Sequence, residues 1–174
     1  MTSTAYFIII RGPLGVGKTT VSKKLVQILN ADYISIDEVL EKRGLDKMDE
    51  KEGTIPAKNF IAANEFVLDK VKKTISSGKI VIFDGCFHQR EQLDHLLKSI
   101  PFPHHGFTLK ASVEACIERD SKRAKVYGKE AAVAVHSLTS KFDYGIVVDT
   151  SGKTVQQTTK DILSYLPQRK DTHK

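Results

Sequence analysis

The stretch Tyr6–Leu29, with the sequence YFIIIRGPLGVGKTTVSKKLVQIL, decides the fold of this chain. The apolar run at its start predicts a buried strand, and the apolar residues at helical spacing near its end predict an amphipathic helix. Between them, Gly12–Thr19 fits the phosphate-binding motif G-x-x-x-x-G-K-[ST] (Walker A) at every specified position. The flanking strand and helix are the context that this motif requires. The stretch therefore predicts a strand, a phosphate loop and a helix.

The residue types of the loop indicate what it binds. Glycines let successive backbone N–H groups point into one concavity, and the N-terminus of the following helix adds partial positive charge. Lys18 can reach the β- and γ-phosphates of a nucleoside triphosphate, and the Thr19 hydroxyl can hold Mg²⁺. We therefore expect ATP and Mg²⁺ to bind here. The residues expected to contact the nucleotide are Gly12, Pro13, Leu14, Gly15, Val16, Gly17, Lys18, Thr19 and Thr20.

Length and composition narrow the class of protein. A chain of 174 residues with 40% hydrophobic and 28% charged residues is typical of one globular domain, which we expect to span residues 1–174. Cys86 and Cys116 lack the spacing of a metal site, and a disulfide framework is not expected, which favours a reducing cytosol. No apolar stretch approaches the roughly 20 residues of a membrane span, and the N-terminus lacks a signal-type pattern. We expect a cytoplasmic protein, either a monomer or a homodimer.

The net charge favours anionic partners. It is +6, with an isoelectric point near 9.2. A nucleotide ligand already accounts for such an excess. The basic residues are scattered, without the interleaved aromatic side chains on which single-stranded nucleic acids stack. We therefore expect ATP and a small-molecule acceptor as partners, keep nucleic acid as a less favoured one, and expect no membrane association.

Strands alternate with helices along the rest of the chain, as in a parallel sheet covered on both faces. Further apolar runs predict strands at 33–36, 80–83, 107–109 and 146–148. Helical spacing, capping residues and helix-ending residues predict helices at 37–43, 56–77, 93–100, 113 onward, 131–138 and 154–166. The expected fold class is α/β, a doubly wound five-stranded parallel sheet with helices on both faces. Its ligand should lie at the carboxyl ends of the strands.

Two aspartates follow predicted strands and should project towards the phosphate loop. Asp37 follows the second strand, where it can orient an acceptor hydroxyl or take its proton. The alternative for Asp37 is a helix N-cap, and the two roles are compatible. Asp84 follows the long apolar third strand, where a carboxylate can hold Mg²⁺ in the manner of a Walker-B aspartate. Its alternative is a turn residue ahead of Gly85. We expect Thr19 and Asp84 to be the metal-binding pair.

The loop, Asp37 and the arginines near Arg119 resemble the small P-loop kinases, a group that includes shikimate, gluconate and adenylate kinases. The segment 83–87 with Arg90 is similar to the Asp-Gly-aromatic-Pro-Arg segment of adenylate kinases, but it has no proline and its arginine lies further on. The segment Ser35–Asp37 is similar to the end of strand two in shikimate kinases and keeps only the second of their two acids. The resemblance covers most of the chain in architecture, and the phosphate loop is its specific motif.

The resemblance implies a mobile lid between strands four and five, at about residues 119–140, with arginines that embrace the transferring phosphoryl group. Arg119 and Arg123 are four residues apart and would share a helix face, so both are candidates. Their alternative role is in ion pairs with neighbouring acids on a solvated face. Residues 38–77 would cover the acceptor, and Arg90 could bind an acidic group on it. By the same analogy, the segment 150–153 would contact the adenine.

These observations predict an ATP-dependent phosphotransferase that moves the γ-phosphoryl group to a hydroxyl or phosphate of a small molecule, with a metabolite favoured. Lys18, Asp37, Arg119 and Arg123 are the expected catalytic residues, and Asp37 and Arg90 are expected to bind the acceptor. The alternatives are a nucleoside monophosphate kinase, a polynucleotide 5′-hydroxyl kinase and a nucleotide-binding regulatory module. A GTPase-type switch is not supported, because the chain has no Asn-Lys-x-Asp segment and its Asp-x-x-Gly match, at 149–152, follows the last strand.

Overall fold

The computed structural model describes residues 5–167. It contains five strands and seven helices in these residues. The strands are β1 (Phe7–Arg11), β2 (Asp32–Ser35), β3 (Val81–Gly85), β4 (His104–Lys110) and β5 (Ile146–Asp149). The helices are α1 (Lys18–Leu29), α2 (Ile36–Arg43), α3 (Ala57–Ser76), α4 (Arg90–Ser99), α5 (Val113–Ser121), α6 (Lys129–Thr139) and α7 (Val155–Ser164).

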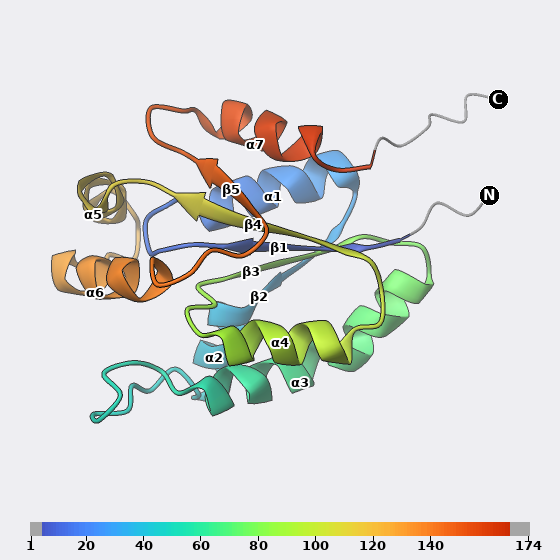
Figure 1. The fold of residues 1–174 in the computed structure, drawn as a ribbon, viewed down its shortest axis with the longest axis horizontal. Coiled ribbons are helices and arrows are strands. Elements are labelled where there is room, and N and C mark those ends of the chain that lie inside the picture. The colour runs from blue at the N-terminus through green and yellow to red at the C-terminus, as the bar shows by residue number, and fades with distance from the viewer. Residues whose placement is uncertain (1–4, 168–174) are drawn as a thin grey trace.

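The strands form one parallel sheet in the order β2-β3-β1-β4-β5. Its register brings the carboxyl ends of the central strands together, because Arg11 pairs with Gly85 and Ser35 pairs with Asp84. Helices cover both faces, with α1 and α7 on one and α3 and α4 on the other (Figure 1). The predicted fold class is confirmed.

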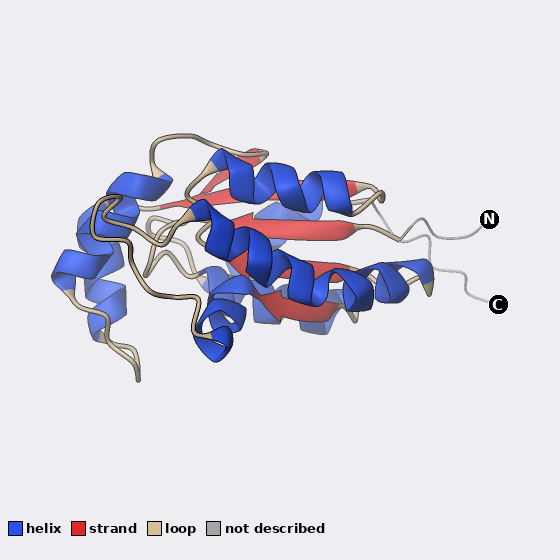
Figure 2. Ribbon diagram, turned by 90° about the horizontal axis from the view of Figure 1, so that it is seen from below, coloured by secondary structure: helices blue, strands red, loops and turns tan. Residues whose placement is uncertain are grey.

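The alternation of side chains along β1 explains the two hydrophobic cores. Phe7 and Ile9 belong to the cluster that includes residues of α3 and α4, whereas Ile8 and Ile10 belong to the cluster that includes residues of α1 and α7. Successive side chains of a strand point to opposite faces, so a central strand covered on both faces must be apolar throughout. Figure 2, seen from the side of α3 and α4, shows helices lying over the face of the sheet.

The predicted elements are all present, with boundaries that differ by a few residues. The largest differences are of three residues: α4 begins at Arg90 rather than at residue 93, and β4 begins at His104 rather than at residue 107 because it pairs along the whole of β1. Pro56 lies just before α3 as its N-cap, with an extended ψ of 146°, rather than inside its first turn. Among the helices of residues 5–167, none combines the length and apolar character needed to cross a membrane.

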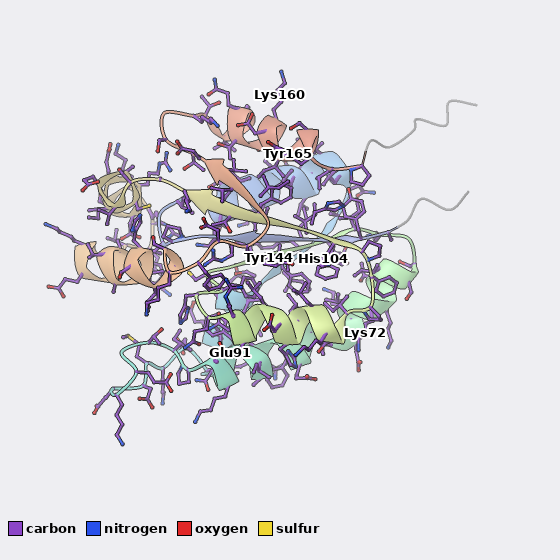
Figure 3. All side chains as sticks on the ribbon, viewed as in Figure 1. Lys72, Glu91, His104, Tyr144, Lys160 and Tyr165 are labelled. Carbon is purple, nitrogen blue, oxygen red and sulfur yellow. The ribbon has the colours of Figure 1, made fainter. Side chains whose placement is uncertain are left out.

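A contact away from the carboxyl edge fixes the chain entering β5. A Cβ atom on Gly106 would lie 2.3 Å from Cε1 of Tyr144, so only glycine lets the Tyr144 ring cross β4 at this point. The Tyr144 hydroxyl and Nε2 of His104 lie 2.7 Å apart, within hydrogen-bond distance. Figure 3 shows the two side chains next to each other. Glycine at position 106 therefore allows the chain between α6 and β5 to pack on the sheet.

The segments expected to cover ligands lie beyond the carboxyl ends of the strands. Helices α5 and α6 pack together there, and the irregular chain between α2 and α3 extends from the same end of the molecule (Figure 1). In doubly wound sheets the ligand binds at this end. The fold therefore places residues of the predicted lid and of the predicted acceptor-covering segment at one edge.

Candidate active site

The phosphate loop connects β1 to α1 and presents an open helix N-terminus. No side chain caps α1, and its first turn carries no acidic residue. The first backbone N–H groups of a helix lack partners within it, so this end can accept an anion. The loop also packs tightly on α5, since a Cβ atom on Gly15 would lie 2.2 Å from the carbonyl oxygen of Cys116. The geometry is that of a phosphate cradle.

Lys18 is buried and charged at the base of this cradle. Its side chain is at the start of α1, where Nζ donates a hydrogen bond of 3.0 Å to the carbonyl oxygen of Pro13. Burial alone would lower the pKa of Lys18. The nearby acidic groups of Cys86, Asp37 and Asp84 together outweigh burial and raise the pKa of Lys18 above its ordinary value. Lys18 therefore stays protonated, as a group that binds phosphate oxygens must.

Asp84 lies at the end of β3 and is 2% exposed. Its Oδ2 accepts hydrogen bonds from the Thr19 hydroxyl at 2.9 Å and from the Tyr33 hydroxyl at 2.8 Å. Its Oδ1 is buried and has no hydrogen-bond partner among the residues that the structure describes. A buried carboxylate oxygen without a partner is costly unless a cation or water satisfies it. The unpaired Oδ1 of Asp84 is therefore available to a cation or water.

The donor set around Asp84 fits Mg²⁺. This ion takes oxygen ligands, commonly one or two from the protein and the rest from phosphates and water. The unsatisfied carboxylate oxygen and the adjacent Thr19 hydroxyl are donors of that kind. Within residues 5–167 there is no cluster of three or more His, Cys, Asp or Glu side chains that could form a denser metal site. The predicted pair, Thr19 and Asp84, is thus brought together.

Asp37 lies in the first turn of α2 and is half-buried. The N-cap of α2 is Ser35, whose Oγ accepts a hydrogen bond of 3.2 Å from the backbone N–H of Glu38. The capping role considered for Asp37 is therefore wrong. Its carboxylate instead accepts weak hydrogen bonds from Cys86, at 3.5 Å from the backbone N–H and at 3.6 Å from the thiol.

Burial is the largest influence on the pKa values of the Asp37 carboxylate and the Cys86 thiol. It raises the pKa of Asp37, although the charge of Lys18 opposes the rise. Burial and the charge of Asp37 together raise the pKa of the Cys86 thiol to about 12. Cys86 therefore stays a neutral packed thiol, since the thiolate is the reactive form. Asp37 is a carboxylate close enough to Lys18 for each to shift the pKa of the other.

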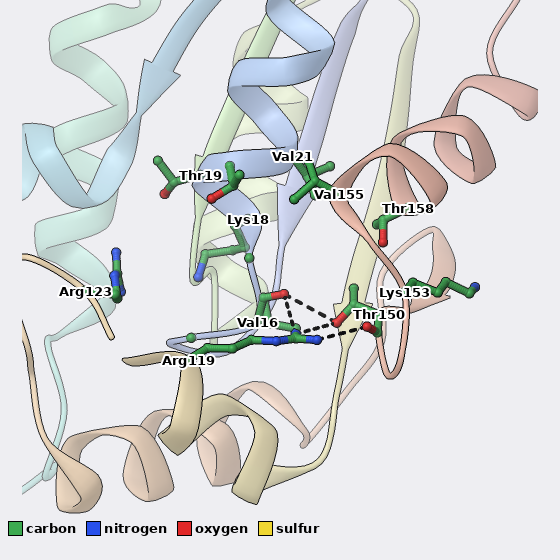
Figure 4. Close-up of a pocket in the computed structure, with 13 residues that line it drawn as sticks. Val16, Lys18, Thr19, Val21, Arg119, Arg123, Thr150, Lys153, Val155 and Thr158 are labelled. Atoms are coloured by element: carbon green, nitrogen blue, oxygen red, sulfur yellow. Dashed lines mark hydrogen bonds between the residues drawn. The ribbon is translucent and has the colours of Figure 1, made fainter. Parts of the chain in front are cut away.

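A pocket of about 250 Å³ lies beside the loop and α1 (Figure 4). Of the predicted nucleotide-binding residues, those from Gly15 to Thr20 line it, whereas Gly12, Pro13 and Leu14 do not. The segment after β5 contributes Thr150 and Lys153. The full lining is Gly15, Val16, Gly17, Lys18, Thr19, Thr20, Val21, Arg119, Arg123, Thr150, Lys153, Val155 and Thr158. Sequence reasoning missed the contribution of α7, whose first turns supply Val155 and Thr158.

Arg119 connects three parts of this pocket. From α5, its Nη1 donates to the carbonyl oxygen of Val16 at 3.2 Å and to Oγ1 of Thr150 at 2.9 Å. Its Nη2 donates to the carbonyl oxygen of Thr150 at 3.0 Å. The dashed lines in Figure 4 show two of these contacts converging on Thr150. Most of the guanidinium's donors are therefore used within the protein.

Arg123 lines the same pocket from a different element. The prediction that it shares a helix face with Arg119 is wrong, because α5 ends at Ser121 and Arg123 lies in the loop that follows. Its side chain is 40% exposed, and Nη1 lies 3.7 Å from Oδ1 of Asp120. In the view of Figure 4, Lys18 lies between Arg123 and Lys153. Arg119 and Arg123 nevertheless line the same pocket.

Arg90 lies outside this pocket. It is the first residue of α4, is exposed, and stacks on the ring of Phe142 with its Cζ 4.8 Å from the centroid. Arg43, in the last turn of α2, stacks on the ring of Phe66 with its Cζ 4.0 Å from the centroid. A cation in the last turn of a helix interacts favourably with the helix dipole, which favours a structural role for Arg43.

Sequence reasoning missed Arg11, which is fully buried behind the loop. Its guanidinium donates to the carbonyl oxygens of Phe87, Phe142 and Thr139 and to the Thr108 hydroxyl. Burial lowers its pKa to about 10. A cation directly after four apolar strand residues is the only sequence signal. Arg11 joins the ends of β1 and β4 to the C-terminus of α6.

Comparisons with known proteins agree with this geometry. A family model described as an AAA domain matches residues 7–141. A putative adenylate kinase from Thermococcus kodakarensis is 27% identical over 173 residues, covering 91% of this chain and 84% of the relative. A shikimate kinase from Francisella tularensis subsp. novicida is 28% identical over 174 residues, covering 91% and 93%. A solved structure of a sugar kinase from Janibacter sp. HTCC2649 is similar in fold, with a TM-score of 0.74 at 17% identity and coverage of 93% and 94%. The resemblance to small P-loop kinases is confirmed.

Proposed function

The chain belongs to the AAA domain family, and we propose that it acts as a P-loop kinase that transfers the γ-phosphoryl group of ATP to a hydroxyl group of a small molecule. The observation that carries this proposal is the meeting of Lys18, Asp37 and Asp84 at one edge of the sheet. Lys18 binds the transferring phosphate, Asp84 belongs to the metal site, and Asp37 serves the acceptor. The named relatives are kinases as well.

The donor would bind in the pocket between the phosphate loop and α7. Backbone N–H groups of the loop and Lys18 hold its phosphates, and the segment from Thr150 to Lys153 with Val155 surrounds the base. Thr19 and Asp84 would hold Mg²⁺, which supplies electrostatic stabilisation of the transferring phosphoryl group when bound. This assignment of ATP and Mg²⁺ rests on the donor set and on the family.

We assign different roles to Arg119 and Arg123. Arg119 has its donors on Val16 and Thr150, so it shapes the donor pocket and holds its two walls together. The Arg123 guanidinium makes no hydrogen bond within residues 5–167 and lines the pocket beside Lys18 and Thr19, so it is the better candidate to stabilise charge on the phosphoryl group. We place both within the proposed lid at 119–140.

Asp37 favours a hydroxyl acceptor over a phosphate acceptor. A hydroxyl must lose its proton as it attacks, and a carboxylate with a raised pKa is a better base than an ordinary one. An acceptor phosphate needs no base, and its negative charge would be repelled by Asp37. A nucleoside monophosphate kinase is therefore the second candidate, supported by the similarity to a putative adenylate kinase. Residues 38–77, with Arg90 nearby, are proposed to cover and bind the acceptor.

The test is a panel of acceptors scored by ADP release above background hydrolysis. It includes sugars, hydroxy acids, nucleoside monophosphates and 5′-hydroxyl oligonucleotides. The proposal predicts that one class of small hydroxyl compound stimulates ADP release and that Asp37→Asn lowers this stimulation by at least about a hundredfold. Stimulation by nucleoside monophosphates alone, unaffected by Asp37→Asn, would favour the second candidate. Stimulation by the oligonucleotides alone would contradict the small-molecule assignment.

A further inference from the structure

A buried carboxylate lies in the segment proposed as the lid, and the chemistry described above does not use it. Asp120 is in the last turn of α5 and is 1% exposed, whereas residues 121–127 around it are exposed. Removing a carboxylate from water is costly unless hydrogen bonds or charges compensate it. The neighbouring acid Glu118, on the same helix, is exposed instead. The position of Asp120 therefore requires an explanation from its contacts.

One oxygen of Asp120 fixes the loop that follows. Its Oδ2 accepts hydrogen bonds from the backbone N–H groups of Tyr127 at 3.0 Å and Gly128 at 2.9 Å. These two groups lie at the end of the loop, directly before α6. Hydrogen bonds from backbone amides to a carboxylate are stronger than those between neutral groups. Asp120 therefore folds residues 122–128 back onto the end of α5.

The other oxygen faces Arg123, which lies within that loop. Oδ1 of Asp120 is 3.7 Å from Nη1 of Arg123 and has no hydrogen-bond partner among the described residues. The Arg123 guanidinium also lies over the ring of Tyr127, 5.6 Å from its centroid. At 3.7 Å the carboxylate attracts the guanidinium without using its hydrogen-bond donors. Arg123 is held in place, but its donors remain available to another anion.

The held arginine faces the phosphate loop. Arg123 lines the pocket together with Lys18 and Thr19. Its charge is close enough to lower the pKa of Lys18, against the larger effect of the acids around that lysine. An arginine aimed in advance at the phosphoryl group loses less freedom when it binds, so its orientation affects the rate of transfer.

We propose that Asp120 is a positioning residue that folds the 122–128 loop and aims Arg123 at the phosphoryl group of the bound nucleotide. The inference rests on the proposed function of the pocket as a phosphoryl-transfer site. Asp120 itself touches neither substrate in this account and acts only through Arg123. A purely structural Asp120 would stabilise the protein without any dependence on Arg123.

A double-mutant cycle separates these two roles. The variants are Asp120→Asn, Arg123→Ala and the combination of both, measured for kcat and for KM of ATP. Asparagine keeps an oxygen for the two backbone amides but removes the charge that faces Arg123. The matched control is Glu118→Gln, which makes the same change at an exposed acid paired with Lys122. Thermal unfolding of each variant checks that it is folded.

We expect Asp120→Asn to lower kcat by between about tenfold and a hundredfold, as for a misplaced catalytic group. In the Arg123→Ala background the same substitution should change kcat less than about twofold, because there is no arginine left to aim. Glu118→Gln should leave kcat within about twofold. If Asp120→Asn does not fold, Asp120→Glu replaces it in the cycle, since glutamate keeps the charge but displaces it. We then expect Asp120→Glu to lower kcat in the wild type and to have little effect on kcat in the Arg123→Ala background.

Two results would overturn the inference. One is an equal loss of kcat from Asp120→Asn with and without Arg123, which indicates an independent structural role. The other is an unchanged kcat in Arg123→Ala or in Asp120→Asn. Lys18→Ala, measured in parallel, separates this failure from that of the proposed function. If Lys18→Ala abolishes transfer while the cycle fails, only the role of Asp120 is wrong, whereas unchanged transfer in Lys18→Ala removes the premise of both.

Discussion

The Thr19 hydroxyl donates a hydrogen bond of 2.9 Å to the Asp84 carboxylate and so joins the start of α1 to the end of β3. The same carboxylate oxygen accepts from Tyr33 on β2, whereas the other oxygen is buried and has no hydrogen-bond partner within residues 5–167. Two protein donors thus fix the orientation of the carboxylate and leave one of its oxygens available. This arrangement suits a carboxylate that binds a cation.

Asp84→Asn should raise the Mg²⁺ concentration needed for half-maximal activity and lower kcat. The expected loss is on the order of a hundredfold or more, because an amide oxygen binds Mg²⁺ far more weakly than a carboxylate does. Tyr33→Phe is the matched variant, since it keeps the carboxylate and removes one of its two hydrogen bonds. A Mg²⁺ titration of ADP release measures both. Equal Mg²⁺ dependence in the wild type and Asp84→Asn would exclude Asp84 from the metal site.

Asp37→Asn should lower kcat with a hydroxyl acceptor by about 10²- to 10⁴-fold, the usual range for a lost general base. In the wild type, kcat should rise with pH through the raised pKa of Asp37, above its ordinary value of 3.8. That acid limb should be absent from the residual activity of the variant. Glu38→Gln, the exposed neighbour paired with Lys42, is the control and should retain the wild-type profile.

The raised pKa of Asp37 also predicts an effect on stability. A carboxyl group whose pKa is higher in the folded than in the unfolded state binds more protons when folded. The free energy of unfolding therefore falls as pH rises from 3.8 through the raised value. Asp37→Asn should remove this fall and should unfold at a higher temperature than the wild type at neutral pH. A lower unfolding temperature in the variant at pH 7 would contradict the direction of the shift.

Arg119→Ala should raise KM for ATP more than it lowers kcat. Removing its hydrogen bonds to Val16 and Thr150 leaves the two walls of the donor pocket unconnected. We expect KM to rise by about tenfold, the equivalent of one lost charge-assisted hydrogen bond. Initial rates at several ATP concentrations measure this. A loss confined to kcat would instead make Arg119 a group that acts on the transferring phosphoryl.

Arg11→Met should destabilise the fold without touching the pocket. It leaves the buried carbonyl oxygens of Phe87, Phe142 and Thr139 without their donor. We expect the free energy of unfolding to fall by about 3 kcal/mol or more. Arg11 also stacks on the Phe142 ring, with its Cζ 4.3 Å from the centroid. Arg43→Met is the control, because it removes a guanidinium from an aromatic ring at an exposed position, and it should cost about 1 kcal/mol or less. Urea unfolding measures both, and equal losses would contradict the role of Arg11.

The fold was predictable because its signals are local. The apolar run of β1, the phosphate loop and the helical spacing of α1 lie next to each other in the sequence, and the other strands repeat the same pattern. The proximity of Asp37 and Asp84 to Lys18 was predictable for the same reason, since parallel strands bring their carboxyl ends together. The predictions that were wrong concern the residue that caps a helix and the residue at which a helix ends. Ser35 rather than Asp37 caps α2, and α5 ends before Arg123.

The remaining features depend on distant partners. Nothing near Arg11 in the sequence indicates that carbonyl oxygens at 87, 139 and 142 will surround it. Asp120 reads as one more charge in a charged run, because its burial depends on the return of the chain at Tyr127 and Gly128. In the sequence Tyr33 is an ordinary strand residue, because its hydrogen bond to Asp84 depends on the pairing of β2 with β3. Such roles require the three-dimensional arrangement.

The most direct test of the account is phosphoryl transfer by the Lys18→Ala variant. The experiment compares the wild type with Lys18→Ala and with a control, Lys24→Ala. Lys24 lies on the same helix but outside the pocket. Each protein is incubated with γ-labelled ATP, Mg²⁺ and the acceptor panel, and the labelled product is quantified. The account predicts labelled product from wild type and Lys24→Ala and a loss of at least about a hundredfold in Lys18→Ala, since this lysine stabilises the transferring charge. Product formation at the wild-type rate in Lys18→Ala would contradict the account.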